Sequence, residues 1–333
     1  MSELAIPLLL VVGLYAVVVP LVTLLVKAAL WLPRRAAGDV AIYSSGVVYA
    51  LLVAPLAAPT LWLVSAAIHA SEPDVVVPRC VAAAMTSDRC QHLIGFAALA
   101  TAVAVVGIVL GHSSRGRFRS WRASEESAAA RRLASLCRAH PALADYAARI
   151  HAVVDPAEDV RTVGLFRPVI EIGSALLERL EDDEVIAALL HEREHAAALD
   201  PLRFLLGEVS VLLNPAGSLL RAELARWRLG REVACDRGAL SRGADRYALA
   251  GALLAAARPL PPPALSAALG GALDLVTLRI KLILGTAEPR TPRPTQVLEV
   301  VALVSCIALP HFLGDWPLDL VHREVAHLFM SMS

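Results

Sequence analysis

Long apolar runs alternate with one extended polar region along this chain of 333 residues. Residues 4–26, 40–71 and 90–114 contain no Asp, Glu, Lys or Arg, and residues 295–314 carry one acid near their start. Each run can supply the roughly 20 apolar residues that cross a bilayer. The pattern therefore predicts about four transmembrane helices. Composition supports this prediction, because apolar residues make up 57% of the chain and the mean hydropathy is +0.60, which is high for a soluble globular protein.

Basic residues favour one orientation of these spans. Lys27, Arg34 and Arg35 follow the first span, arginines cluster at residues 115–122 after the third, and the loop between the second and third is mixed in charge. Since Lys and Arg gather on the cytoplasmic side, we expect a multi-pass cell-membrane protein with both termini outside. Its parts would be residues 1–114 with three transmembrane helices, a cytoplasmic region 115–293, and residues 294–333 with the fourth helix and a short tail. The first run has no basic segment before it and is too long for a signal peptide, so we expect it to be retained.

Cysteine positions agree with this topology, and the net charge argues against nucleic-acid binding. Cys80 and Cys90 share the loop expected outside, where a disulfide can persist, although unpaired thiols are an equal alternative. Cys137 and Cys235 fall in the cytoplasmic region, and Cys306 falls in the fourth span. The formal net charge is zero, so the chain lacks the basic excess that direct nucleic-acid binding requires.

The polar region reads as mainly helical with one small β element. Short β-like runs at 160–166 and 169–172, separated by Arg167-Pro168, predict a hairpin. An edge strand of this kind can bind an extended peptide, or the hairpin can be purely structural. The predicted helices are one or two in 124–153 with a break at Pro141, a short one at 174–180, one that ends near 200, a pair in 204–220, and others at 221–240, 246–257 and 265–284.

The sequence H-E-x-x-H at His191 to His195 is the strongest chemical signal. Residues four apart share one face of a helix, so both imidazoles can bind one metal ion, while Glu192 can act on a water molecule. This is the core of a zinc-dependent hydrolase. The alternative is an exposed helix face, and the charged middle residues Arg193 and Glu194 favour it. A metal site is still compatible with them, because their positions on the helix point away from the metal-facing side.

A third ligand is expected from a later helix. Glu232 and Asp236 lie four residues apart in Arg231-Glu232-Val233-Ala234-Cys235-Asp236. Glu232 can complete the zinc site, and Asp236 can accept a hydrogen bond from a ligand imidazole and fix its tautomer. Alone, the two acids would more often be an ordinary surface pair; beside H-E-x-x-H the zinc interpretation is favoured.

Two further roles stay open on the sequence alone. Asp200 can orient a ligand or cap the next helix. Arg246 and Tyr247 are candidates to stabilise the oxyanion of a tetrahedral intermediate, but no motif marks them, and packing or a solvated surface is the favoured reading.

These motifs together resemble the BlaR/MecR family of integral-membrane metallopeptidases over about residues 115–314. The E-x-A-C-D element from Glu232 to Asp236 is the most family-specific part. The resemblance implies a mainly α polytopic membrane protein with a cytoplasmic zincin-like metallopeptidase domain. It also implies His191, His195 and Glu232 as zinc ligands, Glu192 as general base, and a cytoplasmic protein substrate, in particular a winged-helix repressor.

One departure from that family and two alternatives remain. The best-known members carry an extracellular penicillin-binding sensor domain after the fourth span. About 19 residues follow Gly314 here, so we expect no β-lactam sensing by such a domain. The chain is also similar to the HtpX family of membrane quality-control proteases, although the E-x-x-x-D element of that family usually lacks the cysteine. A non-catalytic membrane scaffold is the third possibility, and the presence of Glu192 argues against it.

Overall fold

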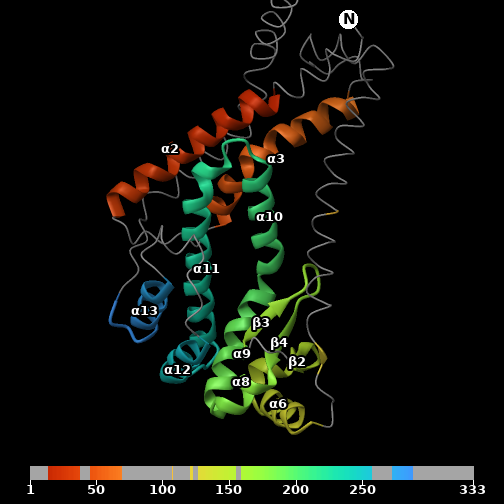
Figure 1. Cartoon of the computed structure of the whole chain (residues 1–333), viewed down its shortest axis with the longest axis vertical. Helices are drawn as coiled ribbons and strands as arrows, with labels where there is room; N and C mark the ends of the chain where they lie inside the picture. The colour runs from red at the N-terminus through yellow and green to blue at the C-terminus, as the bar shows by residue number, and fades with distance from the viewer. Residues whose placement is uncertain are drawn as a thin grey trace, which may run out of the picture.

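The computed structural model describes residues 14–37, 46–69, 107, 121–122, 127–154, 159–256 and 272–287. Figure 1 shows two helices near the N-terminus and a mixed helical and sheet region, with a pair of long helices running between them. Apart from Gly107, the predicted third and fourth spans lie outside the described residues, as do Cys80, Cys90 and Cys306.

The described elements follow the predicted order of helices and strands in most of the polar region. In chain order they are the π-helix η1 (Leu14–Val18), α2 (Val19–Ala37), α3 (Gly46–His69), β1 (Trp121–Arg122), α6 (Ala128–Ala139), α7 (Pro141–Ala144), the 3₁₀-helix η2 (Ala147–Arg149), β2 (Ile150–Val154), β3 (Val160–Val163), β4 (Val169–Gly173), α8 (Ser174–Arg179), α9 (Asp182–Ala197), α10 (Asp200–Leu213), the 3₁₀-helix η3 (Gly217–Leu220), α11 (Arg221–Ser241), α12 (Arg246–Ala256) and α13 (Ala272–Ile283).

Helices α2 and α3 coincide in part with the first two predicted spans. They pack against each other, with Val22 and Val26 of α2 and Leu51 of α3 almost fully buried. The number of spans and their orientation stay predictions. In the described ranges, none of the helices is both long enough and apolar enough to cross a membrane.

The β element is larger than the hairpin that the sequence predicts. Strands β3 and β4 pair antiparallel as expected, but β2 adds to β4 in parallel and β1 adds to β2, which gives a four-stranded sheet in the order β1-β2-β4-β3. The prediction of helix up to Val153 is therefore wrong for its last residues. Ile150 and Val153 are β-branched and buried beside β4, and β-branched side chains fit a pleated surface better than a helix.

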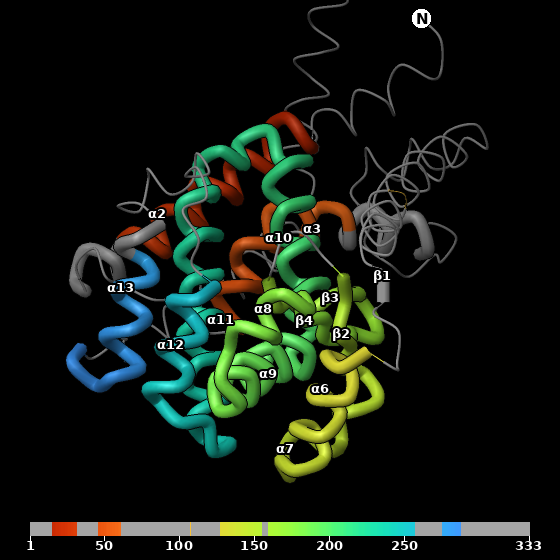
Figure 2. Tube along the Cα trace, turned by 60° about the horizontal axis from the view of Figure 1, so that its bottom comes forward, coloured from red at the N-terminus to blue at the C-terminus, as the bar shows by residue number. Residues whose placement is uncertain are grey.

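Helix α9, which carries H-E-x-x-H, lies at the centre of the polar region. It contacts β3, β4, α10, α11 and α12, and Figure 2 shows it beside α8 and the sheet. Glu181 and Glu184 form a capping box at its N-terminus, which satisfies free backbone N–H groups of the first turn. Val185, Leu189 and Leu190 are fully buried in the main hydrophobic core. Burial on several sides fixes the rotation of α9, and with it the direction of its histidines.

A sharp turn separates α9 from α10. Leu199 adopts the left-handed conformation, with φ of 55°, which is uncommon for a residue other than glycine. Helix α10 then begins at Asp200 rather than near Phe204, and the predicted helix pair is one α-helix followed by the 3₁₀-helix η3. Because the turn is so short, Asp200 lies close to the C-terminal end of α9.

Helices α10 and α11 connect the N-terminal helices to α9. Lys27 Nζ of α2 lies 2.8 Å from Oε1 of Glu223, a fully buried residue of α11. Asn214 Nδ2 donates a hydrogen bond to Thr23 Oγ1 at 2.8 Å. Removing one partner of a buried ion pair is strongly destabilising, so these contacts hold the upper ends of α10 and α11 against α2.

The glycine at the turn between α10 and α11 offers a test of this arrangement. A Cβ at Gly217 would lie 2.0 Å from the backbone oxygen of Val211. We therefore expect Gly217→Ala to destabilise the fold by about 2 kcal/mol, because the backbone must shift to relieve the overlap. Thermal unfolding of the purified chain measures the change. Gly46→Ala is the control, since nothing lies within 4 Å of a Cβ there; equal midpoints for the two variants would contradict the described turn.

Candidate metal centre

Helix α9 places the two histidines of H-E-x-x-H on one face, as the spacing predicts. His191 and His195 are buried, and their Nε2 atoms lie 3.1 Å apart. Their rings meet edge to face, with centroids 4.9 Å apart. Two ring nitrogens aimed at the same point are typical ligands of one metal ion.

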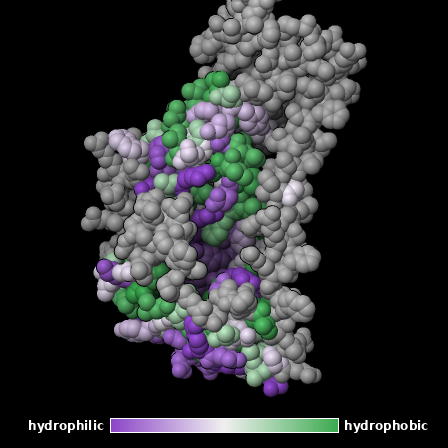
Figure 3. Space-filling view, in the orientation of Figure 1, coloured by the Kyte–Doolittle hydropathy of each residue, from purple (hydrophilic) through white to green (hydrophobic). Residues whose placement is uncertain are grey.

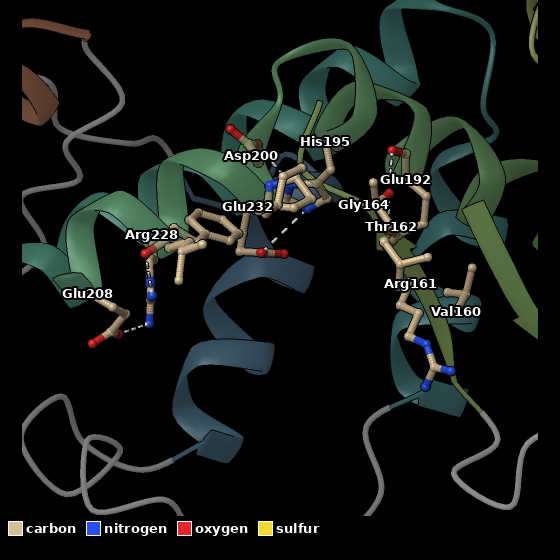
Figure 4. A pocket seen from close by; sticks show the side chains of 15 residues that line it. Val160, Arg161, Thr162, Gly164, Glu192, His195, Asp200, Glu208, Arg228 and Glu232 are labelled. Atoms are coloured by element: carbon tan, nitrogen blue, oxygen red, sulfur yellow. Dashed lines mark hydrogen bonds and ion pairs between the residues drawn. The ribbon is translucent and has the colours of Figure 1, made fainter. Parts of the chain in front are cut away.

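Helix α11 brings Glu232 to the same point. Its Oε2 lies 3.4 Å from His191 Nε2, and its Oε1 lies 3.5 Å from His195 Nε2; Figure 4 shows the carboxylate next to the imidazole of His195. Metal–ligand bonds of about 2.0–2.1 Å in a tetrahedral arrangement put neighbouring ligand atoms about 3.3 Å apart. The three separations match that value, so these residues fit a zinc ion.

Each imidazole is held from behind by an aspartate. His191 Nδ1 lies 2.9 Å from Asp236 Oδ1, and His195 Nδ1 lies 2.9 Å from Asp200 Oδ2. A carboxylate at Nδ1 places the ring proton there and leaves the Nε2 lone pair for a metal. Of the two roles open for Asp200, the structure favours the orienting one, since the N-cap residue of α10 is Leu199.

Two arginines that the sequence did not single out complete the centre. Arg231 contacts both carboxylate oxygens of Asp200 at 2.9–3.1 Å, and Arg279 of α13 contacts both oxygens of Asp236. Arg231 stands directly before Glu232 and could have been suspected from that position. Arg279 lies in no motif, so only the packing of α13 on α11 identifies it.

The charges around the donor atoms favour a cation. Burial by itself raises the pKa of Glu232, but hydrogen bonds to both imidazoles and the charge of Arg279 bring this pKa well below the usual value. Burial disfavours the charged form of His195, yet its hydrogen bonds to Asp200, Cys235 and Glu232 raise its pKa strongly. The surroundings thus favour positive charge at the imidazoles, and a metal ion supplies such charge in place of protons.

Glu192 lies beside the donor atoms without joining them. Burial raises its pKa, although the neighbouring imidazoles oppose the shift. Thr162 Oγ1 on β3 lies 2.7 Å from Glu192 Oε2 and 2.9 Å from its backbone oxygen. A buried carboxylate with a raised pKa and a fixed rotamer is suited to accept and release a proton. Thr162 is a further residue that the sequence did not indicate.

A cavity of about 530 Å³ opens onto these groups. Edge strand β3 and the following Gly164 and Leu165 form one wall, and Phe204, Glu208 and Arg228 of α10 and α11 form the opposite wall. Figure 3 shows hydrophilic residues in a hollow at the middle of the molecule. The cavity is large enough for several residues of an extended peptide, and β3 is placed to pair with it.

Other sequence candidates lie elsewhere. Arg246 and Tyr247 are exposed on α12, and Tyr247 is 72% exposed. They do not line the cavity, because α12 packs on α9 and α13 instead, and their exposure agrees with the solvated surface that the sequence favoured for them. Arg193 lies over the ring of Tyr146, and Glu194 pairs with Arg242, so both point away from the donor atoms as expected.

Cys235 of the E-x-A-C-D element lies behind His195 rather than in the cavity. Its Sγ is 3.5 Å from His195 Nδ1 and 3.8 Å from Asp200 Oδ2. These three residues could form a second donor set. However, Arg231 already neutralises Asp200, and His195 Nδ1 is already bonded to it. The cysteine therefore packs behind the ligand.

A family model described as BlaR1 peptidase M56 matches residues 8–271. Comparisons with the curated proteins and with the solved structures found no match. The matched region covers most of the chain and includes both histidines, Glu192 and the E-x-A-C-D element, which confirms the resemblance to the BlaR/MecR family. The chain belongs to the BlaR1 peptidase M56 family, a family of metallopeptidases.

Proposed function

We propose that this protein is a membrane-embedded zinc metalloendopeptidase of regulatory type that cleaves a cytoplasmic protein. The observation that carries the proposal is the convergence of three donor atoms, from His191, His195 and Glu232, at 3.1–3.5 Å from one another beside a buried Glu192. A structural zinc site is usually closed by a fourth protein ligand. Here two of the three donor residues, His195 and Glu232, line a cavity that leaves room for water and substrate.

The side chains suggest how peptide hydrolysis proceeds. When bound, the zinc ion would polarise the scissile carbonyl and lower the pKa of the attacking water. Glu192 accepts the proton of that water and passes it to the leaving nitrogen. Thr162 holds one oxygen of Glu192 by a hydrogen bond, so the other oxygen can receive the proton.

The sheet edge supports an extended peptide as substrate. Strand β3 is the last in the order β1-β2-β4-β3 and lines the cavity next to Glu192. A peptide that adds to such an edge gains main-chain hydrogen bonds that do not depend on its sequence. A substrate peptide that extends past the donor atoms along β3 in both directions would be cleaved at an internal bond, as by an endopeptidase.

Membrane location and regulation rest on the sequence and the family. The apolar runs and the position of the basic residues favour a catalytic region on the cytoplasmic side of the bilayer. A winged-helix repressor is the substrate that the BlaR/MecR resemblance implies. A quality-control protease like those of the HtpX family, or a scaffold without activity, are the alternatives that the experiments below separate.

Metal binding should depend on the three ligand residues and on the residues that orient them. We expect about one zinc per chain, lost in His191→Ala, His195→Ala and Glu232→Ala, as elemental analysis would show. Asp200→Asn should retain the site but weaken zinc affinity by about 10–100-fold, because the residue behind a ligand histidine fixes its orientation. Competition with a chelator measures that affinity. Full zinc retention in Glu232→Ala would remove this residue from the ligand set.

Glu192 should be needed for cleavage and not for metal binding. Glu192→Gln preserves the size of the side chain and removes its basicity, so activity should fall by about 10² to 10⁴-fold while zinc content stays at the wild-type value. Immunoblots of a candidate winged-helix repressor, produced in the same cells as wild type or variant, follow cleavage. Wild-type cleavage by the variant would favour the scaffold. Cleavage of misfolded membrane proteins but not of the repressor would favour quality control.

Reporter fusions should establish the orientation. A reporter that is active only in the cytoplasm should work when fused after Gly285 and fail when fused at Pro78. Gly285 lies in the region that begins with the arginine cluster at residues 115–122, whereas Pro78 lies in the loop of mixed charge. Immunoblotting for equal amounts of both fusions is the control. The opposite pattern would reverse the topology and rule out a cytoplasmic substrate.

A further inference from the structure

Arg279 of α13 reaches both carboxylates of the E-x-A-C-D element. Its Nε and Nη2 lie 2.9 and 2.7 Å from the two oxygens of Asp236, and its Nη1 lies 2.9 Å from Glu232 Oε2. The guanidinium is largely buried, with 13% of the side chain exposed. Arg279 lies 43 residues after Asp236 and beyond residues 8–271, which match the family model.

One planar guanidinium therefore fixes two side chains of α11. Glu232 and Asp236 are one helical turn apart, and the fork of an arginine can bond both at once, whereas a lysine ammonium is a single point of charge. Through Glu232 the guanidinium holds one donor directly. Through Asp236, whose Oδ1 also lies 2.9 Å from His191 Nδ1, it holds a second.

The contact with Glu232 also affects how that carboxylate can bind a metal. Arg279 engages Oε2, which also lies 3.4 Å from His191 Nε2, whereas Oε1 lies 3.5 Å from His195 Nε2. Glu232 is 30% exposed at the cavity wall, and a glutamate side chain loses considerable rotamer freedom when it is fixed. A bond to Oε2 pre-orders the side chain and leaves Oε1 available as the ligand atom.

Helix α13 also docks through apolar side chains. Ile283 is buried in the main hydrophobic core, and Ile280 and Leu284 pack against the same core. The polar contacts of Arg279 therefore add to an apolar interface that already holds α13 beside α11 and α12. This separates a role at the metal centre from a role in folding.

We propose that Arg279 is a positioning residue of the metal centre: supplied by α13, it orients Glu232 and, through Asp236, His191 for metal binding. The inference rests on the proposed zinc site. It makes α13 part of that site, together with α9, α10 and α11.

The test compares Arg279→Lys and Arg279→Gln with wild type and with Lys281→Gln, which changes an exposed side chain of the same helix. On the purified full-length chain, zinc affinity is measured by competition with a chelator, and the cobalt-substituted protein is examined by visible absorption. We expect Arg279→Gln to weaken zinc binding by about 10–100-fold, as for other residues behind metal ligands. Arg279→Lys retains the positive charge but cannot bond two carboxylates in one plane. Its zinc affinity should therefore lie between those of Arg279→Gln and wild type, and its cobalt spectrum should differ from that of wild type.

Thermal unfolding of the same four proteins separates positioning from folding. Without added metal, Arg279→Lys should melt within a few degrees of wild type, and zinc should raise its midpoint less than it raises that of wild type. Wild-type zinc affinity and cobalt spectrum in Arg279→Lys would overturn the inference. So would a weaker affinity accompanied by a metal-free protein that is already unfolded. A wild-type chain that binds no zinc would instead overturn the proposed function.

Discussion

The structure depends on the close approach of two imidazole nitrogens and a carboxylate in a buried place. His191 and His195 Nε2 lie 3.1 Å apart with Glu232 beside them, and such lone pairs repel one another unless a proton or a metal ion lies between them. A buried polar group without a partner costs free energy. Without a metal ion, the surrounding side chains must therefore hold the two imidazoles and the carboxylate in place. Most of the surrounding architecture provides that support.

Support comes from paired aspartates and arginines on both sides of the centre. Asp200 with Arg231 stands behind His195, and Asp236 with Arg279 stands behind His191. Each aspartate orients a ring, and each arginine keeps an aspartate ionised and fixed. Residues of four helices, α9, α10, α11 and α13, therefore meet at the centre.

The same helices extend the centre toward the N-terminal region. The ring of His195 contacts Phe204 of α10, Phe204 contacts Trp227 of α11, and Trp227 contacts Tyr49 of α3, with centroids 4.7–6.1 Å apart. Together with the pair of Lys27 and Glu223, these contacts pack α2 and α3 against the helices that carry the ligands. The metal centre and the apolar N-terminal helices thus form one continuous packed structure.

The sequence by itself determined the features that depend on residues close together in the chain. Spacing of four residues on a helix identified His191 with His195, and Glu232 with Asp236, because the α-helix turns by a fixed angle per residue. Family membership followed from the same motifs. Most helices of residues 174–256 could also be predicted from apolar periodicity and turn residues, since the apolar face of a helix repeats at a fixed spacing in the sequence.

Only the tertiary structure decided what depends on contacts distant in sequence. Ile150–Val154 became a strand because β4 offered a parallel partner. Asp200 faced His195 because the left-handed Leu199 turns the chain sharply. Arg279 and Thr162 joined the centre through the docking of α13 and β3, and Arg246 and Tyr247 were placed outside it by the packing of α12. No local pattern encodes these outcomes, because each depends on where another segment packs.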